Sequence, residues 1–259
     1  MPPRVQLDIL GVHVDLVQIP QVVERMEAWI EARERRYVCV ANVQSVMVAQ
    51  EDPAFRRVLN DADLCVPDGM PLVWTARLYG HRLRRRVYGP ELMLEFCRAS
   101  ARRGRRHFLY GGAPGVAEKL AERLGARCPG LQVAGWHSPP FRPLTPREEE
   151  ETLGLIRAAA PDVVWVGLGC PKQERWMASC RGRLEAPVLV GVGAAFDFFS
   201  GRVRQARPWV REHGLEWLFR LTQDPGRLAG RYLVQCPPFI PRVLRQWWHD
   251  EPWRPTRRV

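Results

Sequence analysis

The sequence predicts an α/β fold, with a Rossmann-like, largely parallel sheet and a helical C-terminal appendage. Two stretches, RHFLYGGAPGVAEKLAERL and DVVWVGLGCPKQERWM, each read as a strand, a glycine-containing loop and a helix. A third, PVLVGVGAAFDFFSG, runs from a strand into a small-residue turn. Strands separated by helices of this length are typical of βαβ units. We therefore expect a Rossmann-like domain over residues 1–200 and a basic, tryptophan-rich appendage over residues 201–259.

The remaining elements follow from local patterns. QVVERMEAWIEARERR has apolar residues at the spacing of an amphipathic helix, and it leads into the strand YVCVANV. A helix should open at Pro53, because proline is favoured in the first helical turn. Further elements are a short helix over 45–50, a strand ending at Val66, a helix over about 90–102, the strand LQVAGW and a helix near REEEETLGLIRAAA.

Composition indicates a cytoplasmic protein with a full core. The chain has 259 residues, 46% of them hydrophobic, which is enough for one large domain. Its seven cysteines are odd in number and form no C-x-x-C pair, as expected of reduced thiols. The N-terminus alternates apolar and polar residues, unlike a signal peptide, and no run reaches the roughly 18 apolar residues of a membrane span.

The net charge of +11 predicts a polyanionic neighbour. Residues 201–259 hold twelve arginines against five acidic residues, so they carry +7 of that charge, and they hold five of the ten tryptophans. Arginine interleaved with tryptophan suits either a nucleic-acid platform or a membrane-interface surface.

The turn after the strand at 64–66 contains a candidate functional carboxylate. The run ends at Pro67, Asp68 and Gly69, where glycine can supply a positive φ. Ligands of open α/β sheets bind at the carboxyl ends of strands, so Asp68 is a candidate site residue. The alternative is an Asx-turn with no functional role.

Two glycine loops are candidate phosphate sites. Gly111, Gly112 and Ala113 join a strand to a helix, whose N-terminal N–H groups could hold a phosphate, although a plain tight turn explains them equally well. Neither a G-x-G-x-x-G nor a G-x-x-x-x-G-K-[ST] motif is present. An NAD or ATP site is therefore poorly supported, whereas a nucleoside diphosphate remains plausible.

The second loop, GLGCPKQERW, contains Gly169, Lys172 and Glu174. Lys172 could neutralise a phosphate or lie in a solvated first turn, and Glu174 complements the helix dipole.

Asp197 lies between phenylalanines after a buried strand, so it is either a ligand contact or an N-cap. The histidines show no metal-binding spacing, and the D-x-D at 61–63 precedes a strand, so we interpret it as a solvated turn. No metal and no cofactor are expected.

Taken together, the motifs resemble the WecG/TagA/CpsF family of bacterial glycosyltransferases. The resemblance covers about residues 10–231, in unbroken motif order. It rests on LGV, ANVQSVMVA, PDGMPLV, RVYGPELM, LYGGAPGVAEKLAERL, VGLGCPKQERW, GVGAAFDFFSG and HGLEWLFRL. It implies a metal-independent, inverting enzyme that transfers N-acetylmannosamine, or its uronate, from UDP to a polyprenyl-diphosphate-linked N-acetylglucosamine. It also implies a C-terminal appendage that docks peripherally on the inner face of the membrane.

The resemblance also implies roles for individual residues. Asp68 matches a catalytic base, Asn42 and Gln173 match positions that orient the sugars, and Arg86 suits diphosphate charge. Asp197 falls at a donor-site position. The appendage should also close the site: Pro225 should break its helix, leaving Arg220 before the break and Arg227 and Arg231 together after it.

Three residues depart from the pattern of several relatives and bear on the choice of donor: Val40, Gln44 and Gln205. Two other functions remain open, a nucleic-acid-binding protein and a nicotinamide-dependent dehydrogenase. The first explains the charge but not the glycine loops, and the second lacks its fingerprint. We expect a UDP-sugar, a lipid-linked acceptor and the membrane surface as partners, and no nucleic acid. A homo-oligomer is also compatible with the sequence.

Overall fold

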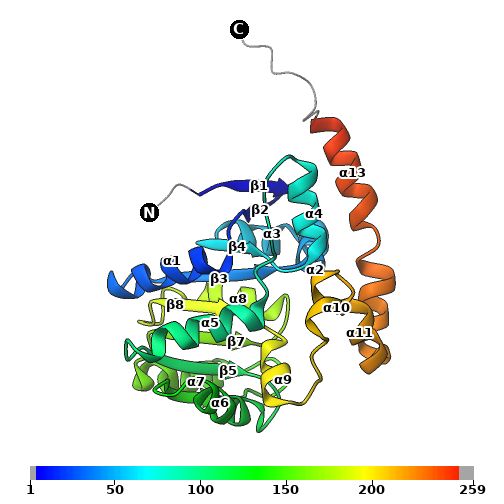
Figure 1. The fold of residues 1–259 in the computed structure, drawn as a ribbon. Helices are drawn as coiled ribbons and strands as arrows, with labels where there is room; N and C mark the ends of the chain where they lie inside the picture. Colours follow the sequence, from blue (N-terminus) through cyan, green and yellow to red (C-terminus); the bar gives the residue numbers. More distant parts are fainter. Residues whose placement is uncertain (1–3, 251–259) are drawn as a thin grey trace.

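The computed structural model describes residues 4–250 and is built on a six-stranded sheet in the order β4-β3-β8-β7-β5-β6 (Figure 1). Every neighbouring pair in this sheet is parallel, which confirms the predicted fold class. The strands are β3 (Arg36–Ala41), β4 (Leu64–Pro67), β5 (Arg106–Gly111), β6 (Gln132–His137), β7 (Val163–Gly167) and β8 (Val188–Gly191).

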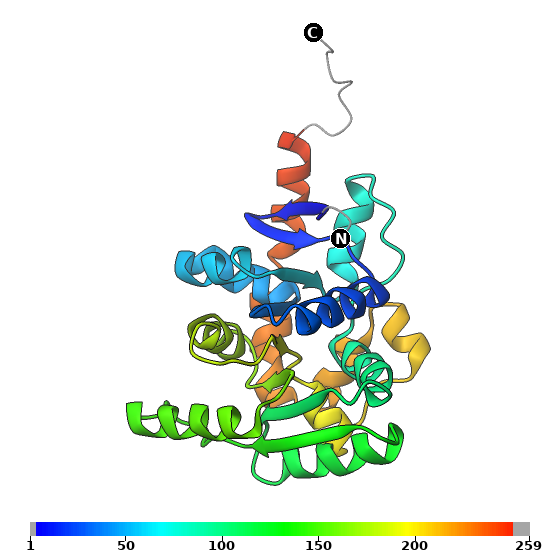
Figure 2. The same ribbon diagram turned by 90° about the vertical axis from the view of Figure 1, so that its left-hand side faces the viewer.

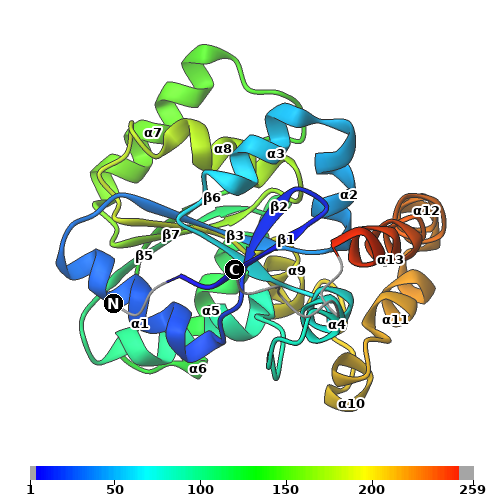
Figure 3. The same cartoon turned by 90° about the horizontal axis from the view of Figure 1, so that it is seen from above.

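Helices cover both faces of the sheet (Figure 3). Alternate strand residues point to opposite faces: Cys39 belongs to one apolar cluster, whereas Val38 and Val40 belong to the other. Strands buried on both faces are continuously apolar, which explains why these runs lack polar alternation. One face carries α1 (Ile19–Glu31), α5 (Gly89–Ala101), α6 (Val116–Arg127) and α9 (Ala195–Ser200), and the other carries α2 (Val43–Glu51), α3 (Pro53–Asn60), α7 (Pro146–Ala159) and α8 (Lys172–Cys180).

Side-chain caps fix the starts of α2 and α3 on the second face. Asn42 accepts from the Ser45 N–H at the start of α2, and Asp52 accepts from the Phe55 N–H at the start of α3. Each such cap contributes roughly 1 kcal/mol. The short helix expected over residues 45–50 thus belongs to a longer one, while the helix expected over residues 90–102 is confirmed within one residue at each end.

Four elements were not predicted, and one of them is α9, which replaces the small-residue turn expected after β8. The N-terminal residues form an antiparallel hairpin of β1 (Gln6–Ile9) and β2 (Val12–Asp15), and α4 (Met70–Leu78) begins directly after Gly69. Asp15 is fully buried at the end of β2, where it accepts from the Cys65 N–H at 2.7 Å and pairs with Arg4. These bonds fasten the hairpin to β4.

The chain after residue 200 runs along one side of the core as a series of helices (Figures 1 and 2). They are α10 (Pro208–Glu212), α11 (Glu216–Gln223), α12 (Pro225–Ala229), the π-helical segment η1 (Gly230–Gln235) and α13 (Phe239–Asp250). The helix break expected at Pro225 is confirmed, because Asp224 ends α11 and caps α12.

The last helix, α13, is fastened to the rest of the protein at three points, one of which is the hydrogen bond that the Tyr79 hydroxyl donates to Asp250 at 2.8 Å. Phe239 and Val243 pack into one of the two apolar clusters. Gln246 exchanges hydrogen bonds with the backbone of Asp8 and Leu10 in the hairpin. Between residues 4 and 250, no helix combines the length and the apolar character needed to cross a membrane. Trp253, expected to contact the membrane, lies outside the described residues.

Candidate active site

A cleft of about 1650 Å³ opens at the carboxyl ends of the parallel strands. Asn42 reaches it from the end of β3, Asp68 from β4, Tyr110 from β5, Gly169 from β7 and Gly193 from β8. Residues of α11, α12 and η1 form the facing wall. This edge of an open α/β sheet is the usual place for a ligand, because the strand ends and helix N-termini converge there.

Asp68 follows β4 at the base of the cleft. Its N–H donates to the Ala41 carbonyl at 2.7 Å, and Gly69 has φ +129°, which only glycine adopts easily. Among the described residues its carboxylate pairs with Arg86, 3.5 Å away, rather than capping its own turn as an Asx-turn would. Burial raises the pKa of Asp68 to about 6, although Arg86 opposes that shift. A carboxyl group with such a pKa is suited to accept a proton near neutral pH.

Arg86 is held between two carboxylates. Its second partner is Glu216 at the start of α11, which also accepts from the Tyr88 hydroxyl at 2.8 Å. Burial pulls the pKa of the Arg86 guanidinium down, but Asp68 and Glu216 outweigh that effect and leave it raised. Gln205, one of the residues that depart from the family pattern, donates to the Tyr88 hydroxyl at 3.1 Å.

Gln173 and Glu174 form a buried pair in the first turn of α8. Gln173 Oε1 accepts from the Gly169 N–H at 3.2 Å, and its Nε2 donates to Glu174 Oε1 at 2.9 Å. Glu174 is only 1% exposed, and within the described part of the chain its Oε2 has no hydrogen-bond partner. Burial raises the pKa of Glu174 to about 7. A buried carboxyl group with a raised pKa differs from the solvated, charged residue that a helix-dipole role predicts. Lys172, in contrast, is exposed at the cleft mouth, with Nζ 5.8 Å from the Phe141 ring.

The residues of the first glycine loop have two different roles: one packs against a neighbouring strand and the others line the cleft. A Cβ on Gly111 would lie 2.6 Å from the backbone of Gly167 on the neighbouring strand, so close strand packing accounts for this glycine. Gly112 and Ala113 do line the cleft, just before α6 begins at Val116.

Asp197 lies in the first turn of α9 and lines the cleft. The N-cap position belongs to Ala194, so the N-cap interpretation of Asp197 is wrong. Its carboxylate is 3.9 Å from Arg202.

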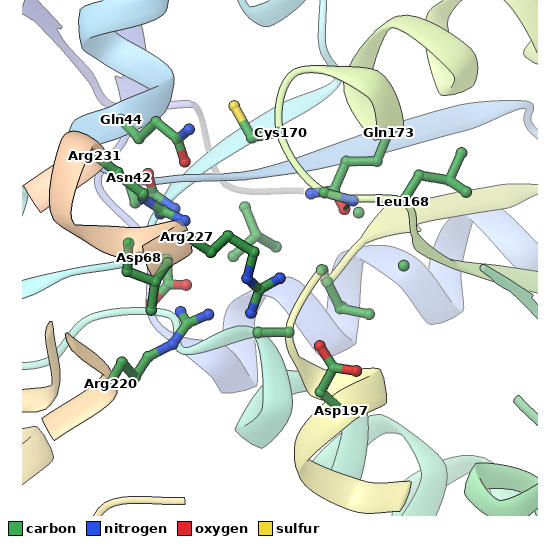
Figure 4. A pocket seen from close by; sticks show the side chains of 18 of the residues that line it. Asn42, Gln44, Asp68, Leu168, Cys170, Gln173, Asp197, Arg220, Arg227 and Arg231 are labelled. Atoms are coloured by element: carbon green, nitrogen blue, oxygen red, sulfur yellow. Dashed lines mark hydrogen bonds between the residues drawn. The ribbon is translucent and has the colours of Figure 1, made fainter. Parts of the chain in front are cut away.

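Three arginines of the appendage point into the same space (Figure 4). Arg220 from α11, Arg227 from α12 and Arg231 from η1 all line the cleft. Arg220 and Arg231 lie close enough to Asp68 to oppose the rise in its pKa. Among the described residues, the buried Nε atoms of Arg220 and Arg231 have no hydrogen-bond partner. The cleft thus places cationic groups opposite a carboxylate, as expected for a site that takes an anionic ligand.

Comparison with known proteins shows which family the chain belongs to. Residues 7–252 match the profile of the glycosyl transferase WecG/TagA/CpsF family. The chain belongs to this family of glycosyltransferases. A relative from Bacillus spizizenii is 30% identical over 217 residues, which cover 84% of this chain and 82% of the relative. Relatives from Bacillus subtilis and Staphylococcus aureus are each 28% identical, over 88% and 93% of this chain and 90% and 92% of their own. All three are named N-acetylglucosaminyldiphosphoundecaprenol N-acetyl-beta-D-mannosaminyltransferase.

In this glycosyltransferase the D-x-D at 61–63 is a turn, as predicted, but only Asp61 is solvated, because the Asp63 side chain is 10% exposed. Asp63 accepts from the Tyr37 N–H and pairs with Arg36 and Arg181, and neither aspartate of the motif lines the cleft. Across residues 4–250, no three His, Cys, Asp or Glu side chains gather closely enough to hold a metal ion.

Sequence reasoning missed Tyr88 and Glu216, although both lie within strings that carry the family resemblance. The arginines of the appendage were predicted as site residues. No local sequence pattern, however, marks Glu216, the glutamate that faces Arg86. Val40 and Gln44, two further departures from the family pattern, do line the cleft.

Proposed function

We propose that this glycosyltransferase transfers N-acetylmannosamine, or a closely related sugar, from UDP to a polyprenyl-diphosphate-linked N-acetylglucosamine. The observation that carries the proposal is Asp68, a carboxylate with a raised pKa at the base of a cleft whose opposite wall is cationic. The names of the relatives support this pair of substrates. Such a reaction belongs to the synthesis of a cell-surface polymer.

Asp68 is the proposed general base. The acceptor hydroxyl gives its proton to the Asp68 carboxylate as its oxygen attacks the anomeric carbon of the donor. The bond between that carbon and the UDP oxygen breaks, and UDP leaves with the bonding electrons. A single displacement of this kind inverts the anomeric centre.

Cations and helix N-termini of this chain stabilise the negative charge on the departing UDP. Arg220, Arg227 and Arg231 come from the appendage, and Lys172 stands at the cleft mouth. The Gly112 N–H already donates to the Gly167 carbonyl at 3.1 Å, so the Ala113 N–H, which precedes α6, is the donor of this loop that suits a phosphate oxygen. Preorganised donors of this type stabilise developing negative charge more effectively than water does.

The sugars are assigned to the part of the cleft lined by Asn42, Gln173 and Glu174. The Asn42 cap occupies Oδ1, which leaves the Nδ2 donor for a sugar hydroxyl. Gln173 and Glu174 are fixed on each other, so Glu174 Oε2 is positioned to bond a hydroxyl or the N-acetyl group of a substrate. Asp197 and the Gly169 loop lie on the donor side.

Residues 201–259 are the proposed docking element for the membrane, on its cytoplasmic face, with residues 1–200 as the catalytic domain. On α13, Ile240, Leu244 and Trp248 recur every four residues and are 50–64% exposed. Arg242 and Arg245 on the same helix are also exposed. An apolar stripe with basic neighbours suits the surface of an anionic bilayer, where the lipid-linked acceptor resides.

The experiment that tests this function is a panel of UDP-sugars offered with a lipid-linked N-acetylglucosamine acceptor. We expect UDP release and a disaccharide product with UDP-N-acetylmannosamine, and much less of either with UDP-glucose or UDP-galactose. Product formation that needs another nucleotide, or no acceptor-dependent release from any donor, would contradict the proposal.

A further inference from the structure

A row of polar side chains connects the appendage to Asp68. Glu216, the first residue of α11, is 7% exposed, and its two carboxylate oxygens have different partners. Oε2 accepts from Arg86 Nη2, and Oε1 accepts from the Tyr88 hydroxyl at 2.8 Å. Arg86 Nη1 in turn lies 3.5 Å from Asp68 Oδ1. The two nitrogens of one guanidinium thus join the proposed base to α11.

This arrangement changes the role expected for Arg86. One guanidinium faces two carboxylates, so its charge is already balanced within the protein. The planar fork of arginine holds such partners in fixed directions, which a point charge would not do. The arginines of the facing wall are therefore the groups left to neutralise the diphosphate. Arg86 instead serves to orient Asp68.

The contact depends on the position of α11. Arg86 and Glu216 are 130 residues apart in sequence and meet only because α11 packs on the core. Without α11, Arg86 would keep Asp68 and the Tyr88 ring, whose centroid lies 4.1 Å from Cζ, but it would lose the group that fixes its other side.

We propose that Glu216 is a positioning residue that completes the base: by holding Arg86 it sets Asp68 in place for proton abstraction only when α11 is docked. The inference rests on the proposed function for the role of Asp68, and it adds a residue that couples closure of the appendage to that chemistry. Docking and activation of the base then occur together, which restricts turnover to the closed enzyme.

The test uses Glu216→Gln, which keeps the size of the side chain and removes its charge. The matched control is Glu212→Gln on α10, an exposed glutamate 3.9 Å from Arg85 that loses the same charge away from the cleft. The charged groups facing Asp68 are Arg86, Glu216, Arg220 and Arg231. Removal of the Glu216 charge leaves only cations around Asp68, so its titration midpoint should move to lower pH.

Two readouts separate the proposal from a merely structural role. The first is the titration of Asp68 in the free protein, followed by NMR of carboxyl-labelled aspartate and assigned with Asp68→Asn. The second is the pH profile of kcat. In Glu216→Gln both midpoints should shift to lower pH, and kcat at its plateau should fall by roughly 10- to 100-fold, as expected of a displaced catalytic group, with donor KM nearly unchanged. Glu212→Gln should match the wild type in all three.

The outcomes distinguish this inference from the proposed function. An Asp68 midpoint that is the same in Glu216→Gln and the wild type would overturn the positioning role, whatever reaction the wild type catalyses. A fall in kcat with an unmoved pH profile would likewise reduce Glu216 to an anchor for α11. If the wild type transfers no sugar while the NMR midpoint still shifts, the coupling of Glu216 to Asp68 stands and the proposed function fails.

Discussion

At the scale of single residues, the environment of each carboxyl group decides what it can do. Asp68 and Glu174 are the two acids that line the cleft with a raised pKa, and burial is the main cause for both. The sequence predicted Asp68 because a turn after a buried strand places it at the ligand-binding edge. It could not predict the contact of Arg86 with Glu216, because only tertiary packing brings those residues together.

Asp68→Asn should lower kcat by roughly 10²- to 10⁴-fold, the usual contribution of a positioned base, while the protein still binds UDP. In the wild type, kcat should fall as the pH drops through about 6, because the protonated carboxyl cannot accept a proton. Initial rates between pH 5 and 8, with UDP binding measured by calorimetry, check both statements. Asp61→Asn, an exposed aspartate in the turn before β4, should leave kcat unchanged. Near-normal turnover in Asp68→Asn would remove this residue from the mechanism.

Glu174→Gln should raise stability at alkaline pH. A folded-state pKa of about 7, above the ordinary value of 4.5, means that the stabilising effect of the bound proton is complete below pH 4.5 and is lost as the pH rises through 7. The difference between the two pKa values corresponds to about 3 kcal/mol in the free energy of unfolding. The glutamine variant would not lose this stability, because its amide does not titrate. Thermal unfolding should show a higher Tm for the variant than for the wild type at pH 8.5, and a much smaller gap at pH 5. Exposed Glu185→Gln is the control, and an equal gap at both pH values would argue against a buried, protonated Glu174.

At the scale of elements, strands and their loops were the most predictable part of the chain. Apolar runs such as residues 163–166 gave the strands, because a sheet covered on both faces needs no polar alternation. The hairpin β1–β2 and α4 were missed, since the first lies outside the βαβ series and the second begins within a turn sequence that masks it. For Gly111 the sequence left a phosphate contact and a plain tight turn open. The structure explains this glycine by close strand packing instead, which only the register of β5 against β7 reveals.

Gly111→Ala should destabilise the fold severely. The new methyl group would lie 2.6 Å from the Gly167 carbonyl group, and alanine would have to adopt φ +127°. Strain of this type costs of order 1–3 kcal/mol, and the clash adds to it. Urea unfolding of Gly154→Ala in α7 provides the contrast: its Cβ meets nothing within 4 Å, so that variant should gain roughly 0.5–1 kcal/mol. A Gly111→Ala protein with wild-type stability would contradict the close approach of β5 to β7.

At the scale of the whole molecule, the appendage both encloses the cleft and offers a surface away from it. Charge and tryptophan content predicted that residues 201–259 meet something anionic, and Pro225 predicted the break between α11 and α12. The sequence could not show which side chains face the cleft, because arginines of the same segment lie both in the cleft and on the exposed surface. Arg220 and Arg231 enter the cleft, whereas Arg242 and Arg245 stay exposed beside the apolar stripe of α13.

The stripe should therefore bind membranes without taking part in the chemistry. Leu244 and Trp248 of this stripe do not line the cleft, unlike Ile240, and they lie on a helix anchored to the core through Phe239 and Val243. Serine at these two exposed positions therefore leaves the anchor in place. The double variant should lose sedimentation with vesicles containing phosphatidylglycerol while keeping turnover on a water-soluble acceptor. Arg242→Gln with Arg245→Gln should weaken binding by about 1 kcal/mol per charge at low salt, and less at high salt, where the surface potential is screened.

Leu155→Ser on α7 removes one exposed leucine, as Leu244→Ser alone does, at a site far from α13 along the chain, and it should bind vesicles like the wild type. If the double variant sediments as fully as the wild type, or if the wild type fails to bind at low salt, α13 is not the docking surface. If turnover on the water-soluble acceptor falls together with vesicle binding, the stripe also supports the closed cleft. The two activities separate only if Phe239, Val243 and Gln246 hold α13 in place without the exposed side chains, so the double variant measures how far these contacts suffice.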